Sequence, residues 1–523
     1  MNAQAPDRST HSRGFAAAAA SGSAWTTVQT VVNKAVTVVA MLVLARILDP
    51  EDYGRANIAT SVGAFISVIS PFILGDVLLS MPGRFRSLAG TALWVGAGSA
   101  VALFAAMLVA APLVEGTTGK AGVAACVMLV AFRPICDAVL VIPFTKLRID
   151  LAYRTLAIID LVVILLATAA SVLMAWIGMG AASLIVPPIA TLAVRGAAYW
   201  YCTAGQIPLR ASPTEIRPLV RRFCAASIGQ YLNNVLQILE MLVLGFFATE
   251  AGAGFFGFAF QLAIQANAVV AVQFGTVLQP IFGLLKAEPA RQSAAFMRAI
   301  RLLAAIAIPV SAFQAALALP AFRMLFGTKW DGAVAIFVAL SIGQGFVFVA
   351  APATALIKAQ GRFRAYVIWQ GVHLVVALAG FIVAARFGAD AALRAASALG
   401  LEAPSEAGVP LAVASASTVA WAVSTPVGMW VCGRPAGLRR REVLAVFVRP
   451  WCAAAVAGSM ALGGWVALEA VLAPVAASII GLFVLAPVLM ASAVWASAGG
   501  SSETRADLVS IARRLAGRAS RRG

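Results

Sequence analysis

Residues 25–54 read WTTVQTVVNKAVTVVAMLVLARILDPEDYG, and this stretch decides the fold class. It predicts an apolar helix long enough to cross a bilayer, because a membrane span needs about 20 residues. One face of the helix is polar, within roughly 140° of helical arc. That face holds Thr26, Gln29, Thr30, Asn33, Lys34 and Thr37. An acidic turn follows and predicts a new helix, with Asp49 as its N-cap and Pro50 in its first turn.

The composition of the whole chain is that of a polytopic membrane protein. Of its 523 residues 61% are hydrophobic and 11% charged, and the mean hydropathy is +0.92. A soluble protein would have about a quarter of its residues charged. The hydropathy predicts an all-α protein with fourteen spans, at roughly 25–45, 56–80, 88–111, 121–143, 155–176, 181–203, 225–247, 252–281, 302–320, 332–354, 365–385, 410–432, 450–470 and 474–497.

The basic residues predict the orientation of the chain. A net charge of +18 would suggest nucleic acid in a soluble protein, but Lys and Arg set the topology of a membrane protein. Assigning the loops alternately to two sides places 29 of the 39 basic residues on the side of the termini and 7 on the other, with three inside spans. This asymmetry predicts an even number of spans and cytoplasmic termini. We expect no nucleic-acid partner.

An internal repeat predicts two lobes. Residues 33–44 align without gaps on residues 233–244 and share Asn and the sequence MLVL. The alignment pairs span 1 with span 7, which predicts two parallel six-helix lobes around a central cavity. The expected divisions are a cytoplasmic tail (1–24), an N-terminal lobe (25–203), a cytoplasmic linker (204–224), a C-terminal lobe (225–432), two extra helices (433–497) and a basic cytoplasmic tail (498–523).

Three cations lie inside predicted spans, where each costs about 2.5–3.5 kcal/mol unless it meets water or a partner. Lys34 is too deep in span 1 to reach the interface, so it either faces a hydrated cavity or forms a structural ion pair. Arg133 either faces the cavity or pairs with Asp137, four residues along the same helix. Arg195 either faces the cavity or partly snorkels. A phosphate-bearing head group would suit these cations.

Span 7 carries an amide-rich face within about 120° of helical arc. It consists of Gln230, Asn233, Asn234, Gln237 and Glu240. Together with Asn33 of span 1, these amides suit the hydroxyls of a sugar, although they would equally suit water. Asp76 and Asp160, near the cytoplasmic ends of spans 2 and 5, either form interfacial pairs or bind a coupling H⁺ or Na⁺. Glu240 is the third residue that could bind such an ion. We expect no other cofactor and no metal site. The sequence contains no constellation typical of an enzyme.

The residues after span 1 carry a family resemblance. Residues 44–54, LARILDPEDYG, resemble the LARxLgPedYG signature of polysaccharide flippases, the Wzx-like polysaccharide transporter branch of the MOP superfamily. LFGTKWDGA at 325–333 and KAQGR at 358–362 are similar to two further family motifs. The pattern from Asn233 to Gly245 also resembles the family, with Glu240 where Asp is usual.

The resemblance implies two six-helix lobes plus two helices in the bacterial inner membrane. It implies a flippase, not an enzyme, that moves an undecaprenyl-pyrophosphate-linked oligosaccharide across the bilayer by alternating access, for lipopolysaccharide O-antigen, capsule or exopolysaccharide. Further partners would be a polysaccharide polymerase and a chain-length regulator. The alternatives are a cation-coupled MATE-like exporter of small molecules, which should have a carboxylate-dominated cavity, and a membrane glycan polymerase or ligase, which should have a large outside loop with Arg or His.

Overall fold

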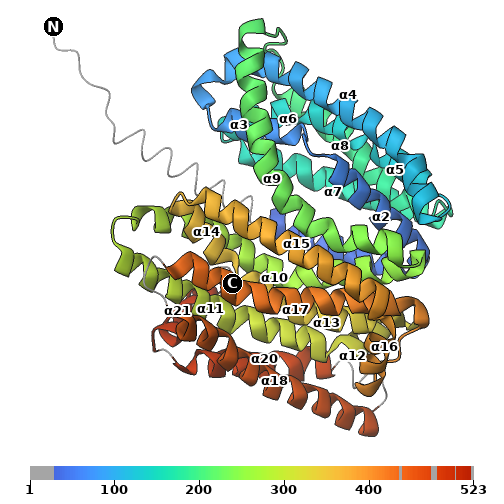
Figure 1. The fold of residues 1–523 in the computed structure, drawn as a ribbon, viewed down its shortest axis with the longest axis vertical. Helices are drawn as coiled ribbons and strands as arrows, with labels where there is room; N and C mark the ends of the chain where they lie inside the picture. Colours follow the sequence, from blue (N-terminus) through green and yellow to red (C-terminus); the bar gives the residue numbers. More distant parts are fainter. Residues whose placement is uncertain (1–28, 435–438, 473–479, 501, 520–523) are drawn as a thin grey trace. The chain divides into compact units, whose positions relative to one another are not determined.

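The computed structural model describes residues 29–434, 439–472, 480–500 and 502–519 (Figure 1). These residues form helices and connecting turns without a strand, which confirms the all-α fold class. They divide into two compact units between Ile238 and Leu239, inside helix α9 (Pro213–Phe247). The expected linker, 204–224, is thus helical from Pro213 onward. The expected domain boundaries stay a prediction.

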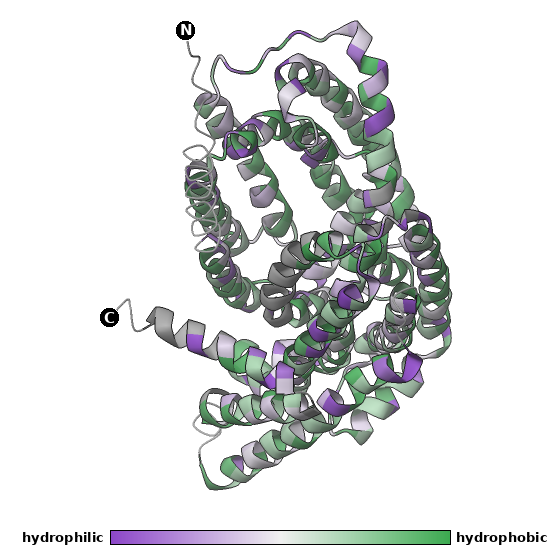
Figure 2. Ribbon diagram, turned by 90° about the vertical axis from the view of Figure 1, so that its left-hand side faces the viewer, coloured by the Kyte–Doolittle hydropathy of each residue, from purple (hydrophilic) through white to green (hydrophobic). Residues whose placement is uncertain are grey.

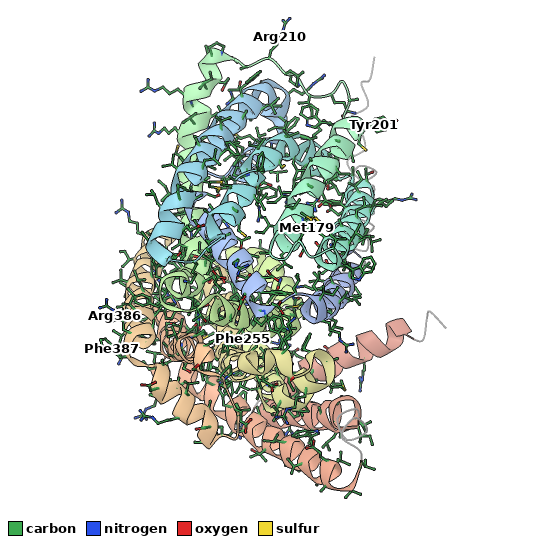
Figure 3. All side chains as sticks on the ribbon, turned by 90° about the vertical axis from the view of Figure 1, so that its right-hand side faces the viewer. Met179, Tyr201, Arg210, Phe255, Arg386 and Phe387 are labelled. Atoms are coloured by element: carbon green, nitrogen blue, oxygen red, sulfur yellow. The ribbon has the colours of Figure 1, made fainter. Side chains whose placement is uncertain are left out.

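Ten helical segments of the described ranges are long and apolar enough to cross a membrane. The expected count of fourteen is therefore not confirmed. Some of the predicted spans do not correspond to one of these ten segments. The predicted span 56–80 is broken into two helices, and part of 474–497 lies outside the described residues. Green predominates along most helices in Figure 2, in keeping with a lipid environment. Large side chains at helix ends extend outward, among them Tyr201 and Phe387 (Figure 3), which are 86% and 78% exposed.

The first unit begins with the helix Gln29–Ile47. Its further helices are α2 (Pro50–Ile66), α3 (Phe72–Leu79), α4 (Phe85–Thr118), α5 (Val123–Val130), α6 (Arg133–Ile149), α7 (Tyr153–Trp176), α8 (Ala182–Cys202) and the first part of α9. Helix α8 packs against α6 and α7, α4 against α5 and α6, and α2 against α5.

The predicted span 56–80 is not one continuous helix. The chain breaks between α2 and α3 at Ser67-Val68-Ile69-Ser70-Pro71. Proline lacks the backbone N–H that a helix interior needs and disfavours the helical conformation of the preceding residue. The hydroxyl of Ser67 donates a hydrogen bond to the Gly63 carbonyl at 2.8 Å, which satisfies an acceptor at the helix end.

The second unit contains the end of α9 and the remaining elements. These are α10 (Glu250–Leu284), α11 (Pro289–Ala316), α12 (Ala318–Phe326), η2 (Thr328–Trp330), α13 (Asp331–Val349), α14 (Ala351–Ala359), α15 (Phe363–Phe387), α16 (Ala389–Ala398), η3 (Ser405–Ala407), α17 (Gly408–Gly433), α18 (Arg440–Val471), η5 (Gly481–Leu485), α20 (Ala486–Ser497), η6 (Ala498–Gly500) and α21 (Ser502–Ala519). Helix α13 packs against α10, α11 and α17, and α18 packs against α11 and α20.

The internal repeat recurs in the local structure of both units. The first helix ends at Ile47 and α9 ends at Phe247, and in each case the next helix begins three residues later. Residues 41, 44, 45 and 48 are buried, and so are residues 241, 244, 245 and 248. The gapless alignment of the sequence therefore matches both the helix ends and the burial pattern.

The acidic turn is a helix start, as the sequence predicts. Asp49 is the N-cap of α2 and Pro50 is its first residue. The carboxylate of Asp52 accepts a hydrogen bond from the Asp49 backbone N–H at 3.3 Å, which is half of a capping box. The turn at Gly180 lies so close that a Cβ there would be 2.7 Å from the Asp52 carboxylate. The turn thus anchors α2 against the start of α8.

The LFGTKW motif builds an aromatic cluster in the second unit. Trp330 is fully buried, and its ring stacks on Phe258 of α10 with the centroids 4.0 Å apart. Phe326 meets the same Phe258 ring edge-on at 4.9 Å. Gly327 has a φ of 73°, a conformation that favours glycine and lets the chain turn from α12 into η2.

We expect Trp330→Ala to lower the free energy of unfolding by about 3–5 kcal/mol, because it removes a fully buried ring from this cluster. The measurement is the thermal unfolding of the purified protein in detergent. Trp176→Ala is the matched control, since Trp176 is 77% exposed at the end of α7, and it should stay within about 0.5 kcal/mol of the wild type. Equal effects of both substitutions would contradict the buried cluster.

Candidate functional site

Part of the polar face of the first helix is turned toward the protein. Asn33, Lys34 and Thr37 are half-buried, whereas Val31 and Val39 are 61% and 58% exposed. A soluble helix would show the opposite arrangement. The valines therefore suit contact with lipid, and the polar residues suit contact with neighbouring helices or a cavity.

The first unit contains a polar cavity of about 510 Å³, within the usual size range of small-ligand sites. Its wall comes from α2, α3, α4, α5, α6, α8 and α9, with the break between α2 and α3 on one side. The polar residues that line it are Thr60, Ser67, Ser70, Asp76, Arg133, Asp137, Arg195, Gln230 and Asn234. Residues far apart in sequence thus converge on one space.

Arg133 is the more accessible of the two cavity arginines. Its side chain is 63% exposed, and its Nε lies 3.8 Å from the Asp137 carboxylate. That separation is beyond a good hydrogen bond, so the pair is loose. The guanidinium of Arg133 therefore keeps donors that can reach a ligand in the cavity.

Arg195 is held more firmly, by a carboxylate from the neighbouring helix. Its Nε lies 3.2 Å from Asp160 of α7, an ion pair that lacks the geometry of a hydrogen bond. Asp160 also accepts hydrogen bonds from the side chains of Gln29 and Tyr199, both at 2.7 Å. One carboxylate thus joins the first helix, α7 and α8. Arg195 is part of the cavity lining, whereas Asp160 is not. Asp160 therefore holds Arg195 from behind the cavity wall.

Asp76 sits on α3 at the edge of the same cavity. Its side chain is 69% exposed, and its carboxylate lies 3.9 Å from Arg148. The cavity lining therefore contains two arginines and two aspartates. One arginine, Arg133, and one aspartate, Asp76, are well exposed. The net formal charge of the lining is balanced, so the site can recognise an anion through its arginines without being uniformly cationic.

A family model described as polysaccharide biosynthesis protein matches residues 43–335, more than half of the chain. The chain therefore belongs to this family. The predicted resemblance is thereby confirmed. This polysaccharide biosynthesis protein is 24% identical over 350 residues to the succinoglycan biosynthesis transport protein ExoT of Rhizobium meliloti (strain 1021), which covers 65% of the chain and 69% of that relative.

Solved structures show that this family member has the fold of MOP-superfamily transporters. The lipid II flippase MurJ in an inward closed conformation superposes with a TM-score of 0.66 at 10% identity, over 90% of this chain and 97% of MurJ. An inward-facing multidrug resistance MATE family transporter of the MOP superfamily gives a TM-score of 0.59 at 13% identity, over 79% and 95% of the two chains. At these identities the likeness concerns the fold alone.

Five of the predicted site residues meet in the cavity of this polysaccharide biosynthesis protein: Asp76, Arg133, Arg195, Gln230 and Asn234. Lys34 and Asn33 are not part of its lining. Asn33 Oδ1 is nevertheless buried and accepts no hydrogen bond from the described residues. Gln237 is exposed, and the side chain of Asn233 lies outside the described part of the structure. The role of every one of these residues stays a prediction.

Glu240, the remaining predicted residue, belongs to the second unit. It is 7% exposed and accepts a hydrogen bond from the hydroxyl of Ser417 on α17. Among the described residues no basic side chain pairs with it. A buried carboxylate with a single hydroxyl partner is costly in its charged form. The environment therefore suits a group that gains and loses a proton, or binds a cation, during transport.

Four candidate residues of the site were not predicted from the sequence. Tyr199 binds Asp160, and the signal for it was its position four residues after Arg195 on the same face of α8. The hydroxyls of Thr60, Ser67 and Ser70 line the cavity, and the signal for the last two was the SVISP break. Hydroxyl residues near a proline inside an apolar run indicate a helix interruption beside a polar space.

We expect Tyr199→Phe to lower the free energy of unfolding by about 1.5–3 kcal/mol, because Asp160 loses one hydrogen bond to its charged carboxylate and keeps that from Gln29. Thermal unfolding of the purified protein in detergent measures the change. Tyr201→Phe removes the same hydroxyl from a side chain that is 86% exposed and should leave stability unchanged within about 0.5 kcal/mol. An unchanged Tyr199→Phe variant would show that Asp160 does not depend on this contact.

Proposed function

We propose that this protein is a flippase for an undecaprenyl-pyrophosphate-linked oligosaccharide, which it moves from the cytoplasmic to the periplasmic leaflet by alternating access. The observation that carries the proposal is the cavity of the first unit, which combines two arginines with hydroxyl and amide side chains. Membership in a polysaccharide biosynthesis family and the name of the relative ExoT, a succinoglycan biosynthesis transport protein, support it.

The arginines would hold the pyrophosphate. A guanidinium can bind phosphate oxygens with two parallel hydrogen bonds, and such charge-assisted bonds are roughly twice as strong as neutral ones. Arg133 is exposed and loosely paired, so it can turn to a ligand, while Arg195 offers a second cation on the neighbouring helix α8, beside Asp160. Lys34, on the inward face of the first helix, is proposed as a third cation on the substrate path.

The neutral polar side chains would contact the sugar next to the pyrophosphate. Thr60, Ser67 and Ser70 offer hydroxyls, and Gln230 and Asn234 of α9 offer amides that both donate and accept hydrogen bonds. A cavity of about 510 Å³ is the size of a small-ligand site. It would therefore recognise the pyrophosphate and the adjoining sugar and leave the remaining glycan and the lipid outside.

An exporter of small organic cations is the second candidate function. The observation that favours it is the presence of Asp76 and Asp137 in the cavity, in the same number as the arginines. Such an exporter would use the aspartates to bind its substrate. In a flippase the same aspartates would offset the charge of the arginines while the cavity is empty.

The test is a chromosomal deletion of the gene in its host. A flippase predicts that the strain loses surface polysaccharide and accumulates the lipid-linked oligosaccharide on the cytoplasmic leaflet, and that the wild-type gene restores both. Increased sensitivity to cationic dyes with intact surface polysaccharide would instead support the exporter. The amount of protein in the membrane is measured in each strain by immunoblot.

A further inference from the structure

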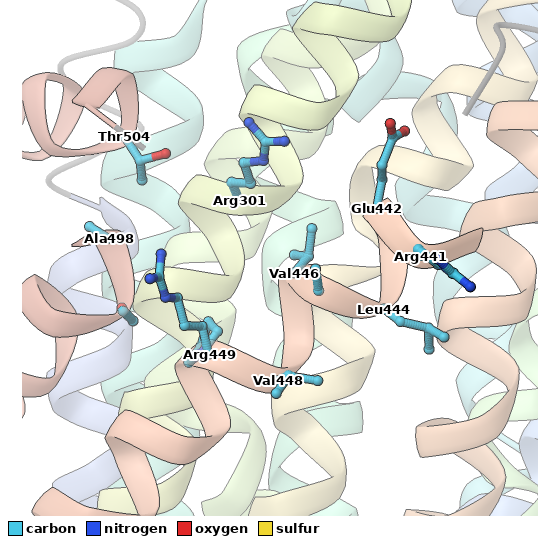
Figure 4. A pocket seen from close by; sticks show the side chains of 12 residues that line it. Arg301, Arg441, Glu442, Leu444, Val446, Val448, Arg449, Ala498 and Thr504 are labelled. Atoms are coloured by element: carbon cyan, nitrogen blue, oxygen red, sulfur yellow. The ribbon is translucent and has the colours of Figure 1, made fainter. Parts of the chain in front are cut away.

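The second unit contains a larger pocket, of about 750 Å³, between α11, α18, η6 and the start of α21 (Figure 4). Its distinctive lining residues are three arginines: Arg301 of α11, and Arg441 and Arg449 of α18. All three are exposed, and within the described ranges none of them forms an ion pair. The one acidic residue of the lining, Glu442, accepts a hydrogen bond from the Arg439 backbone N–H at 3.2 Å. The pocket therefore carries an excess of positive charge.

The pocket is closed on one side by the C-terminal helix α21. Asp507 of α21 accepts a hydrogen bond from Arg298 Nε of α11 at 2.7 Å and a second one from the same guanidinium. This bond holds the pKa of the Asp507 carboxyl below its usual range, so the ion pair persists into acidic solution. Thr504, one turn before Asp507, is buried in the pocket wall. Two arginines one turn apart on α11 thus have different contacts. Arg298 is paired with Asp507 of α21, and Arg301 lines the pocket.

An exposed apolar stripe continues from the pocket along α18. Leu444 and Val448 belong to the lining and are 53% and 61% exposed. Leu462 and Val466 lie on the same face of α18, about five helical turns further along, and are 41% and 53% exposed. The apolar stripe therefore begins beside the arginines and continues along the helix. This combination matches a ligand with an anionic head and apolar chains.

Figure 4 shows how the charges are placed in the pocket. The side chain of Arg449 extends toward the part of the pocket where Thr504 and Ala498 lie, and Arg441 points to the other end. The side chain of Arg301 lies between Thr504 and Glu442 in this view. Arg301 and Arg449 belong to different helices, so a head group between them would join α11 and α18. When the loops are assigned alternately to the two sides of the membrane, all three arginines fall on the side with most of the basic residues. We propose that this side is cytoplasmic.

We propose that this pocket binds an anionic glycerophospholipid of the cytoplasmic leaflet, with the phosphate at Arg301 and Arg449 and the acyl chains along the apolar stripe of α18. Basic pockets between helices on the cytoplasmic side of a membrane protein suit anionic head groups. The bound lipid would link α11 and α18 beneath α21. The site contains none of the residues proposed for transport, so the two proposals can fail separately.

The experiment uses the purified full chain in nanodiscs of phosphatidylcholine with or without phosphatidylglycerol. Native mass spectrometry measures the phosphatidylglycerol retained per molecule. We expect the wild type to retain phosphatidylglycerol in preference to phosphatidylcholine, and the variant Arg301→Gln/Arg449→Gln to bind it about 30-fold more weakly. Arg86→Gln/Arg217→Gln is the matched control, because it removes two exposed arginines of the first unit, on the same proposed side, and it should bind as the wild type does.

Three results would overturn the proposal: no preference for phosphatidylglycerol in the wild type, an equal loss in the control pair, or displacement of phosphatidylglycerol by undecaprenyl phosphate, which would assign the pocket to the substrate. Thermal unfolding in pure phosphatidylcholine shows whether each variant is folded. If the double variant is not, Arg441→Gln/Arg449→Gln replaces it. Leu444→Ser/Val448→Ser tests the acyl stripe independently and should also reduce retention.

Discussion

Transport is expected to fall at least about tenfold when Arg133 is replaced by Gln, and at least about a hundredfold when Arg195 is replaced as well. Each guanidinium would lose charge-assisted hydrogen bonds to the pyrophosphate, worth about 1.5–3 kcal/mol each, and 1.4 kcal/mol corresponds to a factor of ten. The measurement is the initial rate of translocation of lipid-linked oligosaccharide by the reconstituted protein.

Asp137→Asn is the control that separates the two interpretations of Arg133. The pair between Arg133 and Asp137 is loose, at 3.8 Å. If Arg133 served the helix through this pair, Asp137→Asn would harm transport as much as Arg133→Gln. If Arg133 binds the substrate, Asp137→Asn leaves the guanidinium in place, and we expect transport near the wild-type rate.

Replacing Arg195 also removes its ion pair with Asp160, and this loss of stability has to be distinguished from a loss of substrate binding. Asp160 would lose its cation but would keep its hydrogen bonds from Gln29 and Tyr199. Breaking a partly buried ion pair destabilises the protein, so the rate of each variant is divided by the folded amount, measured by size-exclusion chromatography. A rate per folded molecule equal to that of the wild type would exclude Arg195 from substrate binding.

Glu240→Gln is expected to abolish the response of transport to a gradient of H⁺ or Na⁺. The glutamine amide has the shape of the carboxyl and can still accept the hydrogen bond from Ser417, so packing around α9 and α17 should persist. It cannot take up a proton or neutralise a cation. The measurement is the translocation rate in proteoliposomes with an imposed pH or sodium gradient, compared with vesicles without one.

Ser417→Ala is the companion variant for Glu240. It removes the hydroxyl and keeps the carboxylate, so a coupling role predicts that transport still responds to the gradient. If Glu240 only packs α9 against α17, Glu240→Gln should transport normally and Ser417→Ala should destabilise the protein at least as much. A full gradient response of Glu240→Gln would contradict its coupling role.

The sequence was sufficient for the membrane class, because hydropathy is a local pattern. It also singled out polar residues that the structure brings together, while their roles stay predictions. Intramembrane polar residues are costly in lipid, and Asp76, Arg133, Arg195, Gln230 and Asn234 do meet at one cavity. The gapless alignment of residues 33–44 with residues 233–244 agrees with the ends of the two helices, at Ile47 and Phe247.

Contacts between distant helices were beyond the sequence. Gln29 and Asp160 are 131 residues apart, and helical periodicity contains no information about which faces meet. The partner of Arg195 therefore came only from the structure. The break at Ser67–Pro71 was missed for another reason: the residues around it are apolar enough to resemble one continuous span, and the backbone effect of Pro71 outweighed that pattern.

The measurement that tests the central claim most directly is translocation of undecaprenyl-pyrophosphate-linked oligosaccharide in vesicles that contain only the purified protein. Glycan exposed on the outer leaflet is removed by an added glycosidase, so lipid moved from the inner leaflet appears as additional cleavage over time. The account predicts additional cleavage with the wild type and almost none with Arg133→Gln/Arg195→Gln. Cleavage equal to that of protein-free vesicles, together with export of a cationic dye by the same preparation, would contradict it.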